Sequence, residues 1–522
     1  MSKFYKYLLT VPVLAVLSAS VLVCILHDDK VAIEQWHSID RLPNIHPDYC
    51  GTVLPPNIAP LNFLVQENGS YYYVKIYSKQ GEPIEIFSRS AKIIIPQRPW
   101  HKLLNANRGE KLYFDIFVKT QNDLWDRFAV IINKIARENI DAFLVYRKIR
   151  PVYSMGETSI HQRNLQNYDD TPVLSSNNVR GACINCHTFY GNRADKMFFG
   201  VRSQKQGSFT VLVQDDRVCK VGAKFGYTCW HPSGRLALYS INNVRQFFHF
   251  ARNEVRDVVD MDSLLFYYLL DSKTVKTSPK ISRKDRLETF PAWSPDGRYL
   301  YFCSAPILWS DRNKVPPEQY DKVRYDLMRI SYDLESDRWG ELETILSAQD
   351  TGLSILQPRI SPDGRWLLFL MCQYSCWAGY QTSSDLYLID LKAAQETGRY
   401  DYTRLDINSD QSESWHSWSS NSRWIAFSSK KGNGLFTRTY LAYVDQTGKF
   451  YKPILLPQKD PTFYDSCLWT HGVPELVIEP VIITKEKLGR IVRSSRQIEV
   501  TLPITMATPK AAAPSEPWQE RE

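Results

Sequence analysis

The feature that most constrains the fold is an internal repeat in the C-terminal half of the chain. A turn motif, seen in full as Trp-Ser-Pro-Asp-Gly-Arg at residues 293–298, recurs at intervals of about 60 residues. Each copy precedes an apolar strand, and Pro-Asp-Gly favours a tight turn because proline presets φ and glycine adopts positive φ. One mostly β unit per repeat predicts the blades of a β-propeller, five or six in number. The four copies begin at Cys229, Ala292, Arg359 and Ser417.

This repeat resembles that of the TolB-type, WD40-like β-propeller family, which implies a propeller over residues 196–480. Three copies match well, whereas the copy at Trp418 lacks Pro and Gly, so an altered turn is expected there. Family propellers mostly bind partners or ligands on one face, which implies an envelope partner. Some belong to prolyl oligopeptidase-type peptidases, but this chain has no Gly-x-Ser-x-Gly elbow, so we reject that function.

A second motif, CxxCH at Cys183, Cys186 and His187, is the attachment signature of c-type haem. Two thiols at this spacing each add to a vinyl group of one porphyrin, and the following imidazole ligates the iron. A zinc site would need a second Cys/His pair at ligand spacing, and the sequence has no other CxxC, CxxH or HxxxH. The motif predicts one covalent haem c, with His187 as the proximal iron ligand.

The distal ligand decides what such a haem does. A second strong ligand suits electron transfer, whereas an open position permits binding or activation of a small molecule. Met197, the nearest methionine, and His249, flanked by phenylalanines, are the two candidates we favour, although a packed loop explains His249 equally well. The other candidates are His161, His231 and His416.

The N-terminus predicts the cellular compartment. Lys3 and Lys6 precede an uncharged run over residues 7–26 that is long enough for a transmembrane helix. Residues 1–30 are expected to form an uncleaved, single-pass anchor in the inner membrane, with cleavage or lipidation at Cys24 as alternatives. The lysine pair favours a cytoplasmic N-terminus, which places the bulk of the chain in the periplasm, where haem is attached to CxxCH.

The rest of the chain divides into four expected segments. Residues 31–60 are Pro-rich and predict an extended tether. Residues 61–150 carry short alternating strands typical of a small β-sandwich-like domain. Residues 151–195 predict a haem-binding junction, and residues 481–522 a C-terminal extension with a disordered end. Within the second segment, short helices are expected near residues 98–104 and 129–137.

The chain is therefore expected to be mainly β, with a transmembrane anchor, a small β-sandwich-like domain, a haem-binding junction and a propeller. Its net charge of +8 is spread without a dense basic block, so no nucleic-acid partner is expected. A propeller beside CxxCH is similar in arrangement to the alpha subunit of hydrazine synthase, although that class uses more than one haem. Bacteroidota envelope proteins with the same order of parts are also similar.

The function predicted from these features is electron transfer to or from an envelope or redox partner docked on the propeller face. Two alternatives stay open. One is a binding or assembly module of the cell envelope with a structural or sensory haem. The other is a haem enzyme with an open iron site.

Overall fold

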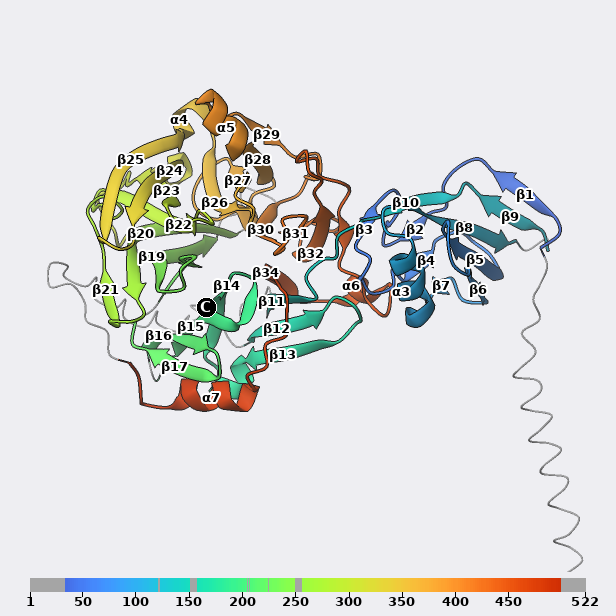
Figure 1. Cartoon of the computed structure of the whole chain (residues 1–522), viewed down its shortest axis with the longest axis horizontal. Helices are drawn as coiled ribbons and strands as arrows, with labels where there is room; N and C mark the ends of the chain where they lie inside the picture. The colour runs from blue at the N-terminus through green and yellow to red at the C-terminus, as the bar shows by residue number, and fades with distance from the viewer. Residues whose placement is uncertain are drawn as a thin grey trace, which may run out of the picture.

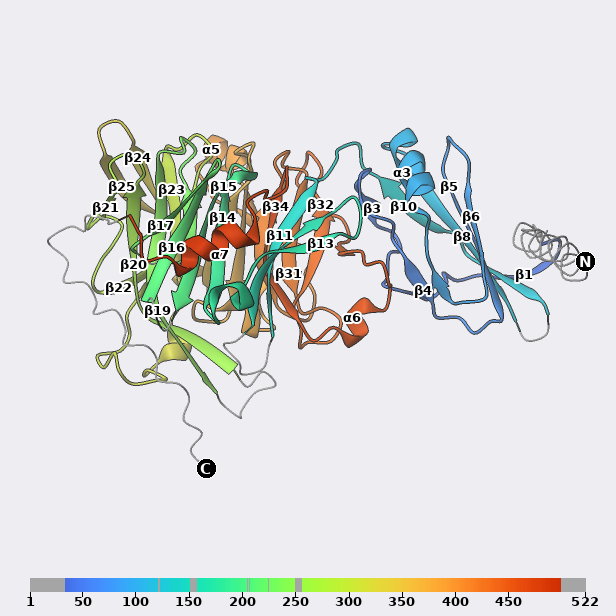
Figure 2. The same ribbon diagram turned by 90° about the horizontal axis from the view of Figure 1, so that it is seen from below.

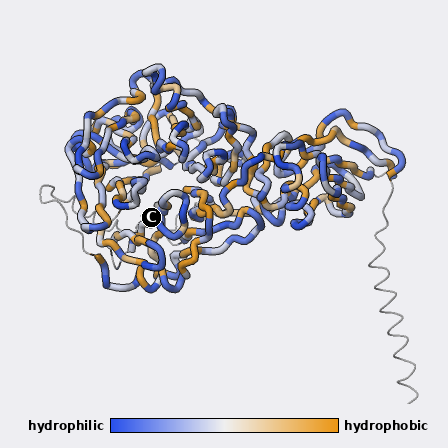
Figure 3. Tube along the Cα trace, viewed as in Figure 1, coloured by the Kyte–Doolittle hydropathy of each residue, from blue (hydrophilic) through white to orange (hydrophobic). Residues whose placement is uncertain are grey.

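The protein has two parts, a β-rich N-terminal domain and a ring of sheets beside it (Figures 1 and 2). This arrangement comes from a computed structural model, which describes residues 33–120, 123–150, 157–203, 205, 207–223, 225–248 and 256–498. Hydrophobic and hydrophilic residues are interleaved along the strands of both parts (Figure 3), as strands with one buried face require. The chain is mainly β, which confirms the predicted class.

The N-terminal domain packs a seven-stranded sheet against a three-stranded sheet. At its centre is β8 (Lys111–Lys119): β5 (Tyr71–Tyr77) pairs along one edge, while β9 (Trp125–Phe128) and β10 (Ile131–Ile135) share the other. Buried residues alternate with half-exposed ones along β5, so one face of the sheet enters the core. The other strands are β1 (Trp36–Ile39), β3 (Val53–Leu54) and β6 (Ile84–Ser88) in the larger sheet, and β2 (Ile45–His46), β4 (Phe63–Val65) and β7 (Lys92–Ile93) in the smaller.

Two expectations for this part differ from the structure. Residues 31–60, expected to form a tether, supply β1, β2 and β3, because apolar side chains such as Leu54 are buried in the domain core. The first expected helix is present as α3 (Gln97–Ala106), which buries Trp100. The second, near residues 129–137, is wrong, since this segment forms β10 and its side chains alternate between buried and exposed.

Six four-stranded sheets of the described residues form the blades of a β-propeller (Figure 1). Blade one joins β34 (Thr470–Val477), from near the end of the chain, to β11 (Phe143–Ile149), β12 (Thr158–Asn164) and β13 (Asp170–Ser175), which closes the ring. Blades two to six follow in chain order, each from its innermost strand outward. Their strands are β14 (Cys183–Tyr190), β15 (Arg193–Ser203), β16 (Gly207–Gln214) and β17 (Arg217–Val221); β18 (Thr228–Trp230), β19 (Leu236–Phe248), β20 (Arg256–Leu269) and β21 (Thr274–Lys276); β22 (Arg286–Trp293), β23 (Tyr299–Pro306), β24 (Asp326–Asp333) and β25 (Arg338–Leu346); β26 (Ser354–Ile360), β27 (Trp366–Cys372), β28 (Asp385–Asp390) and β29 (Tyr402–Arg404); and β30 (Glu413–Trp418), β31 (Trp424–Ser429), β32 (Arg438–Tyr443) and β33 (Ile454–Leu455).

The propeller begins earlier in the chain than expected. Its first strand is β11, so the predicted haem-binding junction at residues 151–195 contains β12, β13 and β14 of blades one and two. The CxxCH motif therefore begins the innermost strand of a blade. Beyond the last blade, α7 (Lys485–Arg493) buries Leu488 and Val492 in the core shared by blades one and two. The predicted disordered end, the tail from Thr501, lies outside the described residues.

The repeated turn has one geometry in three blades. The motif serine accepts a hydrogen bond from the first N–H of the following strand at Ser294, Ser361 and Ser419, over 2.9, 2.9 and 3.0 Å. The fourth copy keeps this turn, because Ser422 adopts a φ of 60° and its N–H donates to Ser419 O over 3.0 Å, as Gly297 N–H does to Ser294 O over 2.9 Å. The expected altered turn at Trp418 is wrong.

The N-terminal domain docks on blade six through a shared core. Trp424 of β31 is fully buried in the same hydrophobic cluster as α3 and β8, and its Nε1 donates to the carbonyl oxygen of Glu138 over 3.2 Å. Ser420 Oγ donates to the Asp141 carboxylate over 2.6 Å. Within the described part of the chain, no helix is long and apolar enough to cross a membrane, and the expected anchor at residues 1–30 lies outside that part.

Three short helices and three 3₁₀ turns complete the described elements. The helices are α4 (Ala348–Thr351), α5 (Leu391–Thr397) and α6 (Phe463–Ser466), and the 3₁₀ turns are η1 (Ser176–Val179), η2 (Tyr320–Lys322) and η3 (Ala378–Tyr380).

Candidate functional site

The axis of the propeller is lined by the innermost strands, and five of these carry a bulge at matching positions. The pairing register slips by one residue within β14, β22, β26, β30 and β34. A bulge bends the strand and re-aims a side chain. The bulged residue has a positive φ of 43–53° in four of them, namely Phe290, Gln357, Trp415 and Val473.

The second half of the CxxCH motif falls on the bulge of β14. Two residues, Cys186 and His187, lie between the paired positions Asn185 and Thr188, while the facing strand β15 has only one residue between the partners. In β30, Trp415 and His416 lie between Ser414 and Ser417 in the same way, although His416 itself pairs with Phe427. His187 in blade two is thus the structural equivalent of His416 in blade six, and Cys186 that of Trp415.

His187 is enclosed between blades one and two. Its side chain is 2% exposed, and its Nε2 lies 3.3 Å from the carbonyl oxygen of Val145 in β11. The carbonyl can only accept, so Nε2 carries the proton, and Nδ1 has no hydrogen-bond partner among the described residues. Burial lowers the pKa of His187 to about 4, so the ring is neutral at pH 7.

His416 makes the same contact without any neighbouring cysteine pair. Its Nε2 lies 3.2 Å from the carbonyl oxygen of Leu368 in β27, the second strand of blade five. Its Nδ1 also lacks a partner, and burial lowers its pKa to about 3. A histidine at this position therefore joins two blades independently of haem. Three other blades place proline there, as Pro291, Pro358 and Pro474.

His187 is buried, but one of its ring nitrogens has no partner among the described residues. Its Nε2 donates to a carbonyl, as the second nitrogen of a metal-bound imidazole commonly does, and Nδ1 keeps a lone pair, but the residue is only 2% exposed. Cys183, at the start of β14, is different: it is half-exposed, and its Sγ lies 3.6 Å from Asn185 Nδ2. The motif thus combines a half-exposed thiol with a buried imidazole.

Of the two favoured distal ligands, one lies on the strand paired with β14 and the other lies outside the described residues. Met197 is fully buried in the apolar core between blades one and two, where its backbone pairs with Phe189 and Val213. A thioether in this core packs as an apolar side chain. His249 lies outside the described residues.

Aromatic side chains from three blades meet near the axis. The ring centroids of Tyr227 and Phe290 are 4.3 Å apart, and those of Tyr227 and Trp415 are 5.5 Å apart. We call Tyr227, Phe290 and Trp415 the axial cluster. Trp377 and Tyr380 continue it outward, with the Arg256 guanidinium 4.6 Å from the Tyr380 centroid. The axial cluster was not predicted, although each member precedes a motif tryptophan by three positions, at Trp230, Trp293 and Trp418.

An ion pair joins two other blades across the axis. Arg359 of β26 donates to Glu475 of β34 over 2.9 Å, from blade five to blade one. Burial raises the pKa of Glu475, and the Arg359 charge opposes that rise. The same positive charge lowers the pKa of His416, so Arg359 lies close to this ring as well.

A buried carboxyl group lies in blade three, where Asn242 contacts both this group and Thr289 of blade four. Asp260 of β20 is 1% exposed, its Oδ2 accepts from Asn242 Nδ2, and its Oδ1 has no partner among the described residues. Burial raises the pKa of Asp260 to about 7. Burial raises the pKa of Tyr325, and the charge of Asp260 raises it further. The Tyr325 hydroxyl is also buried with no partner among the described residues.

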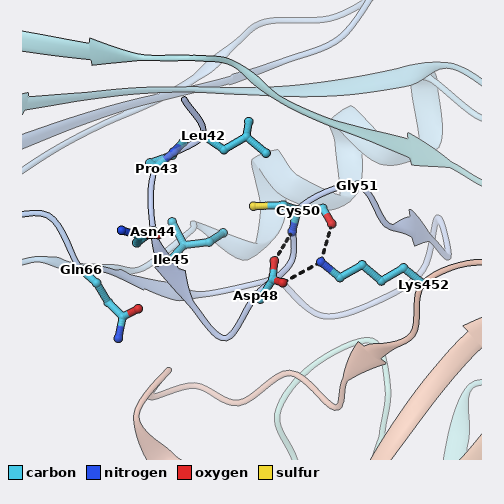
Figure 4. Close-up of a pocket in the computed structure, with 9 residues that line it drawn as sticks. All are labelled: Leu42, Pro43, Asn44, Ile45, Asp48, Cys50, Gly51, Gln66 and Lys452. Atoms are coloured by element: carbon cyan, nitrogen blue, oxygen red, sulfur yellow. Dashed lines mark hydrogen bonds and ion pairs between the residues drawn. The ribbon is translucent and has the colours of Figure 1, made fainter. Parts of the chain in front are cut away.

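In the part of the chain that the structure describes, no metal cluster forms at the CxxCH motif, and the pocket drawn in Figure 4 lies elsewhere. Within the described residues, no group of three His, Cys, Asp or Glu side chains is arranged to hold a metal ion. Figure 4 shows a pocket of about 490 Å³ where the N-terminal domain meets Lys452 of blade six. The Lys452 ammonium lies 2.7 Å from Asp48, and burial raises the pKa of the nearby Cys50 to about 11. Such a thiol is a weak nucleophile, so this pocket has no evident chemistry.

No family model and no curated protein matches the chain. Solved structures match at low identity. Puromycin hydrolase is 15% identical over 60% of this chain and 45% of that chain, with a TM-score of 0.32. A GH74 enzyme of Niastella koreensis is 10% identical over 60% and 46%, with a TM-score of 0.38, and an oligogalacturonate lyase of Vibrio parahaemolyticus is 12% identical over 73% and 100%, with a TM-score of 0.30. The chain matches less than half the length of puromycin hydrolase.

Proposed function

We propose that this chain is a membrane-anchored, periplasmic propeller that carries one covalent haem c on Cys183 and Cys186 and takes part in electron transfer with an envelope partner. The sequence supports this function through the CxxCH motif and the apolar N-terminal run. The observation that carries it is the half-exposed Cys183 at the open start of β14, a strand that lines the propeller axis.

Residues around the propeller axis would enclose a bound haem. The axial cluster offers ring faces on which an aromatic ligand could stack. Its member Trp415 occupies the same bulge position in β30 as Cys186 does in β14. When bound, haem supplies a one-electron couple whose potential depends on its axial ligands and burial. His187 is the proposed proximal ligand, and its Nδ1 is the nitrogen without a partner among the described residues.

A second candidate function is a propeller that binds an envelope partner or ligand on its axial face without using haem for electron transfer. One observation favours it: the contact between His187 and Val145 is repeated by His416 and Leu368, so the histidine of the motif has a structural explanation of its own. In this case the axial cluster is the candidate binding surface.

A haemochrome assay on the full chain decides between the two. The chain would be made in a host competent in cytochrome maturation and measured as the parent, as Cys183→Ser, and as Cys219→Ser, a half-exposed cysteine outside the motif. Covalent haem in the parent and the Cys219 variant, with loss or a single thioether in the Cys183 variant, supports the first function. A folded parent without haem overturns it.

A further inference from the structure

The outer face of the seven-stranded sheet carries an unusual set of side chains. Pairing registers place Trp36, Trp125, Lys119 and Tyr71 in one row across β1, β9, β8 and β5. The next row contains Arg127, Phe117, Tyr73 and Phe87, from β9, β8, β5 and β6. We call the six aromatic residues of these two rows the aromatic face. A solvated sheet face is normally polar, so this face is exceptional.

The rings of the aromatic face contact one another. Centroid distances are 5.8 Å for Trp36 and Phe117, 5.6 Å for Tyr73 and Phe117, and 5.9 Å for Phe87 and Trp125. Trp36 is 44% exposed and Phe87 42% exposed, and Leu124, in the adjoining turn between β8 and β9, is 61% exposed. Large apolar groups thus gather at one end of the sheet.

Cationic side chains lie over these rings. The Arg127 guanidinium lies 5.4 Å from the centroids of both Trp36 and Phe117. Arg89 and Lys119 lie over Tyr71, at 5.3 and 5.7 Å. Aromatic rings beside cations are the combination found where proteins meet lipid headgroups, since rings occupy the interface and cations attract phosphates.

The position of this face in the chain indicates what covers it. The apolar run that predicts the anchor ends at Leu26, and Trp36 of β1 follows ten residues later. Ten extended residues span at most about 36 Å, so the sheet end is kept near the bilayer. Figure 1 shows β1 and β9 at the end of the molecule opposite the propeller.

We propose that the aromatic face and Leu124 lie in the headgroup region of the bilayer that holds the N-terminal segment. This orients the elongated molecule with its N-terminal domain on the membrane and its propeller projecting away from it. The inference rests on the proposed membrane anchorage, and it is independent of whether the chain carries haem.

Photocrosslinking in liposomes tests this placement. The full chain would be reconstituted into vesicles containing lipids with a photoreactive group at headgroup depth, and labelled residues would be mapped by mass spectrometry. Labelling of Trp36, Phe87 and Leu124 several-fold above Tyr402 and Leu435, which are 41% and 66% exposed on the propeller, supports the proposal. Phe87→Ser with Leu124→Ser should lower that labelling, whereas Tyr402→Ser with Leu435→Ser should not.

Three outcomes overturn it. If only residues 7–26 are labelled, the anchor is in the membrane but the aromatic face does not contact the bilayer. If no residue is labelled, both the proposed anchorage and the proposed membrane contact are wrong. Labelling that soluble peptidoglycan fragments abolish while the chain stays in the vesicles would identify the face as a glycan platform. A haemochrome assay on the same samples reports separately on the proposed function.

Discussion

His187 and His416 occupy equivalent positions in blades two and six, and each donates from Nε2 to a carbonyl of the second strand in the preceding blade. Only His187 belongs to a CxxCH motif. This pair therefore offers an internal comparison between the histidine predicted as the proximal iron ligand and one outside the CxxCH motif.

Replacing either histidine by alanine should destabilise the propeller to a similar degree. Each change removes a buried ring and one hydrogen bond, which together cost about 2–4 kcal/mol. Urea unfolding of the parent, His187→Ala and His416→Ala measures the effect. The structural role of His187 is contradicted if His187→Ala keeps full stability and alters a haem spectrum that His416→Ala leaves unchanged.

Removing one partner of the ion pair across the axis should cost more than removing both. Arg359→Met leaves the buried Glu475 carboxylate without its cation, which costs about 2–3 kcal/mol, less than a fully buried pair because Arg359 is part-exposed. Arg359→Met with Glu475→Met should recover most of this loss, since no charge stays buried. A double-mutant cycle by chemical unfolding measures the difference, and strictly additive losses would argue against the pair.

Local chemistry explains which parts of the fold were predictable. The turn at residues 294–297 favours Pro, Asp and Gly, so it leaves a recognisable motif in the sequence, although Ser422 shows that other residues can adopt it. Blade one has no such signal, because β34 and β11 are joined by pairing and not by a turn. The helix predicted near residues 129–137 was wrong for a related reason. The alternation of buried and exposed side chains along β10 is set by its pairing with β8.

The candidate site was predictable only in part. CxxCH identifies Cys183, Cys186 and His187 as a unit, but where the ring of His187 goes depends on Val145 in another blade. The axial cluster likewise depends on three strands far apart in the chain meeting at one axis, although the aromatic residue before each motif tryptophan was a readable signal.

The repeated turn contains a matched pair of glycines. Gly297 and Gly364 have φ of 73° and 77° in the same turn position, so alanine is strained at both. At Gly297 an added Cβ would lie 2.6 Å from His231 Nε2, whereas at Gly364 it would meet nothing within 4 Å. Gly297→Ala should therefore lower the free energy of unfolding by about 1–3 kcal/mol more than Gly364→Ala. Equal losses in thermal or urea unfolding would show that backbone strain alone acts.

The buried Asp260 should make the stability depend on pH. Its folded pKa is raised to about 7, so between about pH 4 and pH 7 the folded protein holds a proton that the unfolded chain releases. Its contribution to the free energy of unfolding is complete below pH 4 and is lost as the pH rises through 7. Asp260→Asn mimics the protonated acid, so it should reduce the loss between pH 5 and pH 8 by about 2–3 kcal/mol.

Urea unfolding at pH 5 and pH 8 measures this effect, with Asp401→Asn, whose carboxylate is 75% exposed, as the control. The control should keep the pH dependence of the parent. If Asp260→Asn keeps it too, Asp260 is ionised in the folded state at pH 5, which requires a cation or water molecules at its unpartnered Oδ1. A reduced dependence in the Asp260 variant alone would instead identify this buried carboxyl as a group that exchanges its proton near neutral pH.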